Sequence, residues 1–440
     1  MKNKFIITLL LLVGFLQAQD KKESYSFSLQ QAIDHALEHN YSAINANRDI
    51  EAAKKKKWET TTIGLPQING NVNYANNFKI QQNQITAFGQ TSTLQIGNYN
   101  TMDASLKLSQ LIFDGSYLVG LQSAKTYLKI SENAKLKTNQ EIREIVVNSY
   151  GNVLLANETV AVLEKNKSIL EKTVSDTKET YKNGLIEEEN VEQLQITLSS
   201  INSALGNVNR QKKIALDMLK LVLGIDIENE LVLTDNLDNL TQSNVDLSIL
   251  NENFNVENSI DFQIGKNLEE SKRLLLKLER SKALPSLAGS VNFGSNALGS
   301  RFTMFQADQP WYNYSNVGVG LNVPIFSSFA RSARTQQAKI ALEQSKTDLI
   351  QTEQKLKLDF EKAKSDYEYS LEQLTTSKSN LSLAERIEGK QQIKFKEGLS
   401  SSFDLTKAQE QLYDAQQKYL SSMLDVINKK ATLEKLLNKN

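Results

Sequence analysis

The sequence YKNGL at residues 181–185 returns in the second half of the chain as FKEGL at residues 395–399. Two other stretches repeat at nearly the same offset: LKLSQLIF at 106–113 returns as GVGLNVPIF at 318–326, and Leu65-Pro66 returns as Leu284-Pro285. Self-similarity at a fixed offset indicates a repeated structural unit. We therefore predict two copies of one design, residues 19–223 and 254–440, joined by a polar segment over 224–253.

The residues around the repeated glycines predict long helices. No proline occurs between Phe113 and Lys282 or after Pro324, and proline is costly inside a helix. The residues that step by three and four through 191–222 are apolar except Lys212, and those at the offset of the repeat through 405–436 are apolar except Ser422 and Lys429. The segments 116–182 and 329–396 also favour helix, and each is long enough for roughly 100 Å at 1.5 Å per residue. Each half is thus expected to hold an antiparallel helical hairpin that turns at Gly184 or Gly398, although any helical bundle would show the same heptads.

Four short segments alternate between apolar and polar residues, as strands do: 68–75, 102–109, 287–293 and 317–323. A sheet with one wet face alternates in the same way as a membrane strand. Four strands are too few to close a barrel, so membrane strands of this kind require several chains to share one barrel. Tyr74, Trp311, Tyr312 and Tyr314 suit an aromatic girdle at the membrane interface. Tyr312 and Tyr314 are out of phase with residues 317–323, which predicts a bulge or a slip in this segment.

The first residues have the three parts of a secretory signal peptide. Lys2 and Lys4 are positive, residues 5–16 are apolar, and Ala18 suits a cleavage site. The apolar run is too short to span a bilayer, so we expect residues 1–18 to be a signal peptide and not a buried helix or an anchor. The chain has no cysteine, so we expect neither a disulfide nor a lipid anchor on cysteine.

The balance of charge and hydropathy narrows the function further. With 51 basic and 51 acidic residues the formal charge is zero, which argues against nucleic acid as a partner. Beyond the signal peptide no apolar stretch is long enough to cross a bilayer as a helix, so we expect no membrane-spanning helix.

Several motifs together resemble the TolC-like family of outer membrane efflux proteins. They are FSLQQAI at 27–33 with ALEHN at 36–40, LSQLIFDG at 108–115, and the stretch from Gly398 through Ala415. The resemblance covers nearly all of the chain after the signal peptide. It implies a mainly α protein with membrane β-strands, in which three chains share one β-barrel and their helical hairpins form a periplasmic tunnel.

The same resemblance implies a function and partners. The protein would be an outer-membrane channel that exports small molecules or proteins, in multidrug efflux or type I secretion. Its partners would be two more copies of the chain, a periplasmic adaptor protein, an inner-membrane pump of the RND or ABC type, and outer-membrane lipid. The segment that joins the repeats would lie around the middle of the tunnel.

The resemblance also assigns roles to residues at the hairpin turns. Gly184, Leu185, Gly398 and Leu399 would form the tips that meet the adaptor. Asp404 would line the periplasmic gate as a ring of carboxylates. This sequence departs from the family there, because Lys407 and Asn190 stand where acids are often found. Asp404 and Lys407, at positions i and i+3 of a helix, are expected to neutralise each other in part.

Two competing readings remain open at this stage. His35 and His39 fit the pattern H-x-x-E-H of some zinc enzymes, but the pattern is common by chance in helical sequence. No cysteine nucleophile, Ser-His-Asp constellation or phosphate-binding glycine loop accompanies it, so we expect no enzyme, no metal and no cofactor. A periplasmic coiled-coil adaptor or a surface stalk would explain the heptads, but not the doubled alternating segments.

Overall fold

The structure is a computed structural model that describes residues 24–439, the side chain of Ala87 excepted. The predicted signal peptide lies outside the described residues. The described residues form two compact units: residues 24–48, 133–263 and 351–439 make the first, and Asp49–Glu132 with Ile264–Ile350 makes the second. Each sequence repeat contributes residues to both units. The units therefore do not correspond to the repeats, and the predicted repeat boundaries stay a prediction.

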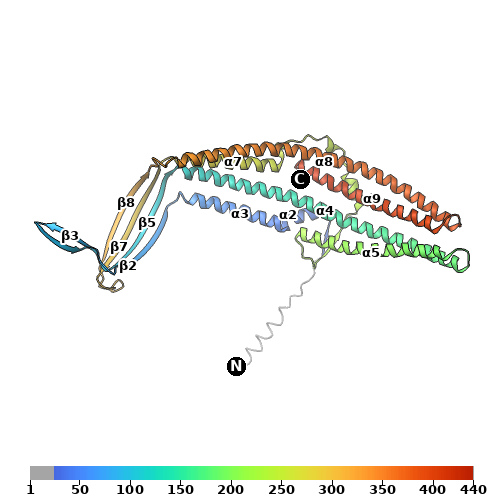
Figure 1. The fold of residues 1–440 in the computed structure, drawn as a ribbon, viewed down its shortest axis with the longest axis horizontal. Helices are drawn as coiled ribbons and strands as arrows, with labels where there is room; N and C mark the ends of the chain where they lie inside the picture. The colour runs from blue at the N-terminus through green and yellow to red at the C-terminus, as the bar shows by residue number, and fades with distance from the viewer. Residues whose placement is uncertain (1–23, 440) are drawn as a thin grey trace, which may run out of the picture. The chain divides into compact units, whose positions relative to one another are not determined.

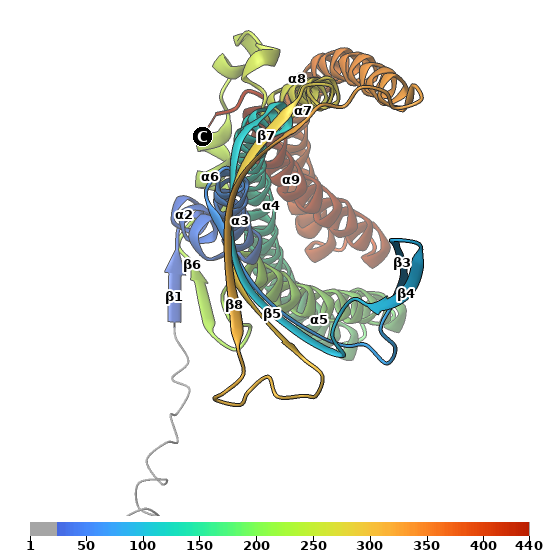
Figure 2. The same ribbon diagram turned by 90° about the vertical axis from the view of Figure 1, so that its left-hand side faces the viewer.

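The second unit contains the four predicted strands in one antiparallel sheet. The strands β2 (Gln67–Asn76), β5 (Asn100–Asp114), β7 (Ser286–Gly299) and β8 (Trp311–Asn322) lie in the order β2-β5-β7-β8 and form a curved surface (Figure 2). The four prolines of the chain stand beside strand ends, at positions 66, 285, 310 and 324. Proline has no amide hydrogen to donate to a strand ladder, so its place outside the strands leaves the ladder hydrogen bonds intact.

The register of this sheet separates an apolar from a polar face. Tyr74 pairs with Met102, Met102 with Ala297, and Ala297 with Trp311, so Tyr74 and Trp311 lie in one row on one face. The same face carries the apolar residues of the middle of each strand: Ile68, Val72, Leu106, Leu108, Val291, Phe293, Val317 and Val319. Leu108 and Val291 are half-buried and the other six side chains are exposed in the single chain, so the described residues leave most of this apolar surface uncovered.

The predicted bulge in β8 is wrong. The pairing of β7 with β8 runs without a shift from Ser286 to Ala297, and the sheet's irregularity lies in β5, between Leu111 and Phe113. With the register unbroken, Tyr312 and Tyr314 fall on the polar face, where the Tyr314 hydroxyl donates to Asp103 Oδ2 at 2.9 Å. These two tyrosines therefore leave the predicted girdle, which remains a prediction for Tyr74 and Trp311.

A second small sheet was not predicted. The strands β3 (Gln82–Ala87) and β4 (Gln90–Gln95) form a hairpin between β2 and β5 (Figure 1). Phe88 and Gly89 make its turn with φ of 56° and 80°, as a two-residue hairpin turn requires. The strands consist mostly of Gln and Thr, so hydropathy gives little sign of them.

The predicted helical hairpins are confirmed with matched lengths. In the first, α4 (Gly115–Lys182, 68 residues) is followed by α5 (Glu188–Leu223, 36 residues); in the second, α8 (Ala330–Lys396, 67 residues) is followed by α9 (Ser402–Leu436, 35 residues) (Figure 1). Every position of the two predicted heptad seams is buried or half-buried. In the part of the chain that the structure describes, no helix is both long enough and apolar enough to cross a membrane.

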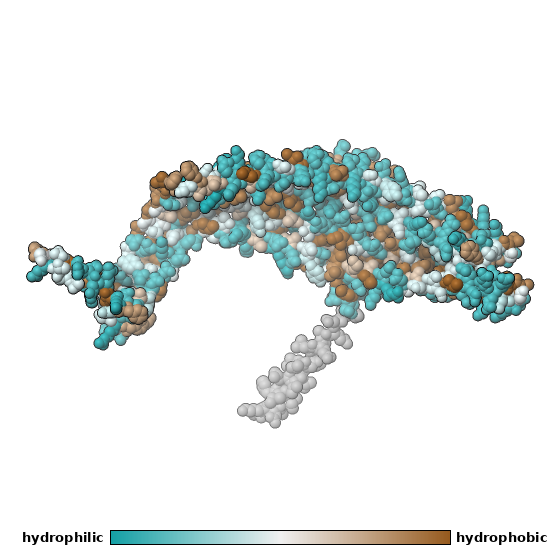
Figure 3. All heavy atoms as spheres, in the orientation of Figure 1, coloured by the Kyte–Doolittle hydropathy of each residue, from teal (hydrophilic) through white to brown (hydrophobic). Residues whose placement is uncertain are grey.

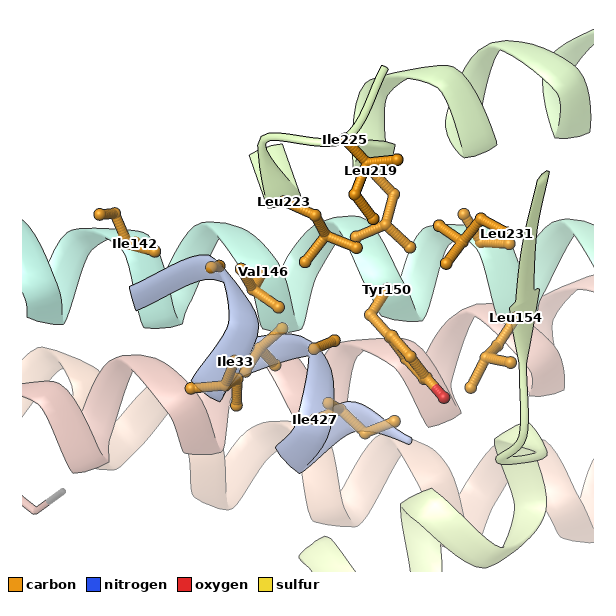
Figure 4. Packing of buried hydrophobic residues seen from close by; sticks show 14 of the residues in the cluster. Ile33, Ile142, Val146, Tyr150, Leu154, Leu219, Leu223, Ile225, Leu231 and Ile427 are labelled. Atoms are coloured by element: carbon orange, nitrogen blue, oxygen red, sulfur yellow. The ribbon is translucent and has the colours of Figure 1, made fainter. Parts of the chain in front are cut away.

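The segment that joins the repeats folds onto the first unit. It contains β6 (Glu230–Leu233), α6 (Leu237–Asn244) and two short 3-10 helices, Ser248–Asn251 and Val256–Asn258. β1 (Ser24–Phe27) pairs with β6 in parallel, and α2 (Leu29–His39) follows β1. The apolar core beneath them joins Ile33, Val146, Tyr150, Leu219 and Leu231 (Figure 4). Four-residue strands carry too little periodicity to be predicted. The remaining helices are α3 (Tyr41–Thr62) and α7 (Ile260–Ser281).

A buried tyrosine from each long helix fastens the joining segment. Tyr150 of α4 and Tyr367 of α8 are both fully buried. The Tyr150 hydroxyl lies 2.9 Å from Asp235 Oδ2 and 3.0 Å from the carbonyl oxygen of Phe27. The Tyr367 hydroxyl donates to the Asn244 carbonyl at 2.7 Å and accepts from the amide of Asp246 at 3.0 Å. Burial raises the pKa of both tyrosines, so both keep their protons near neutral pH.

Replacing either tyrosine with phenylalanine should loosen the joining segment. Tyr150→Phe or Tyr367→Phe leaves buried hydrogen-bonding groups unpaired, at a cost of about 1–3 kcal/mol. Amide hydrogen exchange over residues 230–258 should therefore become faster. The matched controls are Tyr127→Phe on α4 and Tyr369→Phe on α8, because these tyrosines are 51% and 61% exposed. Unchanged exchange in both variants would show that these hydroxyls do not hold the segment.

Candidate functional site at the hairpin tips

The first hairpin turns on a glycine in the left-handed conformation. Gly184 has φ of 73°, its amide donates to the Tyr181 carbonyl at 2.8 Å, and the Leu185 amide donates to the Thr180 carbonyl at 3.2 Å. This pair of bonds is the Schellman arrangement, which satisfies carbonyls left free at the end of a helix. Glycine adopts the required φ without steric strain.

The second hairpin turns in the same way. Gly398 has φ of 72°, its amide donates to Phe395, and the Leu399 amide donates to Lys394 at 2.8 Å. The leucine after each glycine is exposed, Leu185 by 75% and Leu399 by 73%. The structure thus places the four predicted tip residues at the two turns, and their contact with an adaptor stays a prediction.

Asp404 takes part in the cap at the N-terminus of α9. Its Oδ2 accepts from the Ser401 hydroxyl at 2.8 Å and from the Ser401 amide at 3.3 Å, while the Ser401 hydroxyl accepts from the Asp404 amide at 3.2 Å. This reciprocal pair is a capping box. The hydrogen bonds from Ser401 hold the pKa of the Asp404 carboxyl below its ordinary value. Asp404 therefore has a structural role that sequence comparison with a gate residue does not suggest.

Asn190 occupies the same place in the first repeat but acts across the hairpins. Its Oδ1 accepts from the amide of Ser402, the first residue of α9, at 3.3 Å. Glu187, the residue before α5, makes no side-chain cap of its own. Asn190 thus gives α9 a second partner for its free amides and ties one tip to the other. The bond joins residues 212 positions apart, so sequence reasoning could not find it.

Lys407 and Asp404 do not pair directly, and their partial neutralisation stays a prediction. Within residues 24–439 the two side chains form no ion pair, and Lys407 Nζ lies 6.0 Å from the centre of the Phe403 ring. Asp404 is turned back toward Ser401, while Lys407 lies along the helix over an aromatic face. The nearby positive charge that helps to lower the pKa of Asp404 comes from Lys394.

A polar cluster that was not predicted lies behind the second tip. Gln409 of α9 is 1% exposed and hydrogen-bonds Glu388 of α8, whose charge also acts on Tyr413 of α9. Burial raises the pKa of the Glu388 carboxyl, and a hydrogen bond from Gln409 offsets part of that rise. Burial and the Glu388 charge raise the pKa of Tyr413 to about 12. The only sequence signal is that Gln409 directly follows the seam residue Ala408.

The two histidines form a stacked pair. The rings of His35 and His39 are 4.1 Å apart and nearly parallel, and partial burial lowers the pKa of His35. Among the described residues, no group of three or more His, Cys, Asp or Glu side chains could hold a metal ion.

The sequence and the structure were both compared with known proteins. The family model of the outer membrane efflux proteins matches residues 32–225 and 257–439. The chain belongs to this family. Membership makes it an outer membrane transport protein and not an enzyme, which settles both competing readings of the sequence.

Individual relatives are distant but cover nearly the whole chain. The chain is 20% identical over 402 residues to the outer membrane protein TolC of Vibrio cholerae, which covers 91% of this chain and 88% of that protein. The crystal structure of CusC superposes with a TM-score of 0.76 at 18% identity and covers 96% of this chain and 95% of that one. The Campylobacter jejuni CmeC outer membrane channel gives 0.73 at 17% identity, over 96% and 90%. These structures confirm the predicted fold class of this outer membrane efflux protein.

The cap at Asp404 makes a prediction about pH. Asp404→Ala removes the acceptor of the Ser401 amide and hydroxyl, so the amides of Ser401 and Asp404, which the capping box holds, should lose protection from hydrogen exchange. In the unchanged protein the ionised carboxylate supports the cap above the ordinary pKa of 3.8, and this support is lost as the pH falls through the lower pKa of the folded state. Protection factors measured across this pH range should converge for the two proteins at the acid end. Equal protection near neutral pH would contradict a capping role.

Proposed function

We propose that this outer membrane efflux protein is the exit duct of a tripartite export system, built from three copies of the chain. The observation that carries the proposal is the four-stranded sheet with one apolar face and two open edges. The edge strands β2 and β8 each have ladder groups without a partner in the described chain. In a lipid bilayer every backbone group needs a partner, so the edges must pair with other copies.

The topology supports edge-to-edge pairing between copies. Neighbouring strands alternate in direction through the order β2-β5-β7-β8, so β2 and β8 run in opposite directions. Pairing β8 of one copy with β2 of the next therefore continues the antiparallel ladder. Four strands cannot enclose a pore, whereas three copies supply twelve. The apolar face would then meet lipid, and the polar face with Asp103 and Tyr314 would line the channel.

The helical hairpins would continue this channel as a tunnel in the periplasm. Asp404, Asn190 and Lys407 stand close to the tips and would surround the narrow end, where the capped Asp404 remains ionised. The exposed Leu185 and Leu399 would receive the periplasmic adaptor, because an exposed apolar side chain beside a polar rim is typical of a docking point. Lys182, paired with Glu179 at 2.6 Å, belongs to that rim. An inner-membrane pump of the RND or ABC type would drive export of small molecules or proteins.

Assembly can be tested by mass. The purified protein in mild detergent should have the mass of three chains of 49.4 kDa, less their signal peptides. Chemical cross-links should join β2 of one copy to β8 of another. A stable monomer that conducts ions in a planar bilayer would contradict the shared barrel.

Docking can be tested by placing a charge at the tips. Leu185→Asp or Leu399→Asp should abolish export while the trimer still assembles, because burying the new carboxylate without a partner in a contact costs on the order of several kcal/mol. Leu247→Asp is the control, since Leu247 is 64% exposed and lies in the joining segment.

Asp404→Ala should behave differently from the leucine variants. It should leave adaptor binding intact and change the cation selectivity of the pore in planar bilayers. Normal export by both leucine variants would show that the tips are not the docking site. Unchanged ion selectivity in Asp404→Ala would show that Asp404 does not line the constriction.

A further inference from the structure

One end of the sheet carries exposed apolar side chains at all four junctions with the helices. The register places the start of β2 and β7 and the end of β5 and β8 at this end. Each junction exposes a large apolar residue, and together they form what we call the junction belt: Leu65, Phe113, Leu284, Ile325, Phe326 and Phe329. Figure 3 shows hydrophobic atoms gathered where β7 and β8 meet α7 and α8. Exposed apolar clusters of this kind mark a binding surface.

The loop between β8 and α8 is built to hold its apolar residues outward. Ile325, Phe326 and Phe329 are 89%, 75% and 77% exposed. Arg331 fixes the loop, because its guanidinium donates to the carbonyls of Pro324 at 2.7 Å and Ile325 at 3.1 Å. Ser328 and Phe329 have φ of 48° and 66°, a conformation that side chains other than glycine rarely adopt. Such strain persists only where the surroundings impose it, and it is concentrated at functional sites.

Positive charges accompany the junction belt. Lys54 to Lys57 form an unbroken run near the end of α3, next to Trp58, which is 60% exposed. Lys54 pairs with Glu51 and Lys56 with Glu59, whereas Lys55 and Lys57 form no ion pair in the described part of the chain. Tryptophan and lysine side by side are typical of a membrane interface, where the ring lies at the headgroups and the ammonium reaches phosphate.

We infer that this end of the sheet binds anionic phospholipid, with the junction belt at the boundary of the acyl chains and the lysine run on the headgroup phosphates. The inference rests on the proposed function, which puts the sheet in a membrane, and adds the class of lipid. It is continuous with the apolar face of the sheet, because the exposed Val319 and Leu321 of β8 are followed just beyond the strand by the exposed Val323 and Ile325. Clusters of lysine and arginine beside a membrane attract anionic lipid.

Charge also argues for lipid over a second copy as the partner. Pairing β8 of one copy with β2 of the next would bring the start of α8, with Arg331 and Arg334, toward the end of α3, with Lys55 and Lys57. Like charges do not stabilise such a contact. Phosphate groups between them would supply the missing anions.

The two tryptophans of the chain allow a direct test. Trp311→Phe leaves Trp58 as the only tryptophan in the reconstituted trimer. In vesicles of phosphatidylcholine mixed with phosphatidylglycerol, bromine near the headgroup end of the acyl chains should quench Trp58 more than bromine near the chain ends. Brominated phosphatidylglycerol should quench it at least about twofold better than brominated phosphatidylcholine, as expected for a basic surface. Lys55→Gln with Lys57→Gln should bring that ratio to about one.

Matched variants separate this inference from the proposed function. Phe326→Ala with Phe329→Ala should reduce the quenching of Trp58, whereas Phe302→Ala with Phe305→Ala, exposed aromatics in the loop between β7 and β8, should not. In a Trp58→Phe protein the remaining Trp311 reports on the sheet itself. Quenching of Trp311 but not of Trp58 would overturn the lipid site and leave the channel proposal standing, and quenching of neither would overturn both. Loss of the trimer in the Phe326 and Phe329 variant, with unchanged lipid quenching, would assign the loop to a second copy and overturn the inference.

Discussion

Hydrogen bonding along the edges of the four-stranded sheet is the constraint on which the rest of the structure depends. A lone chain leaves the outer ladders of β2 and β8 open, and lipid offers those groups no partner. Closing the ladder with further copies satisfies the edges and puts all apolar faces outward at the same time. The uninterrupted register between β7 and β8 matters for this reason, because a slip of one residue would turn Val317 and Val319 into the channel and Tyr314 into the lipid.

The two repeats share a backbone plan and differ in how polar side chains complete it. Both tips use the same glycine turn, since only the backbone decides it. The starts of α5 and α9 are less alike: Ser401 and Asp404 cap α9, whereas Glu187 leaves α5 without a side-chain cap. Asn190 then serves the other hairpin through Ser402. The difference concentrates polar bonds on the second hairpin, where Glu388, Gln409 and Tyr413 also lie.

Sequence analysis reached the architecture because its signals are periodic and repeated. The helices α5 and α9 follow from heptads, the helices of 68 and 67 residues from absent prolines, and the turns at Gly184 and Gly398 from a doubled motif. The failures have a common physical origin. Asp404 bonds to Ser401 instead of Lys407 because the helix cap competes for its carboxylate. Spacing along a helix identifies neighbouring residues but does not decide which of them a side chain bonds. The β1–β6 pair and the bond from Asn190 to Ser402 join distant parts of the chain through few residues, which leaves no local pattern.

The paired tyrosines have a mechanical consequence. Tyr150 and Tyr367 fix each long helix to one common segment, so they act as two pivots at matching heights. From its pivot, α4 continues to Lys182, and α8 continues from its own to Lys396. At the α-helical rise of about 1.5 Å per residue these are lever arms of about 48 Å and about 44 Å. A rotation of only about 5° at either pivot would move a tip by about 4 Å, close to the diameter of a small side chain. Arms of nearly equal length would let both hairpins swing through the same arc.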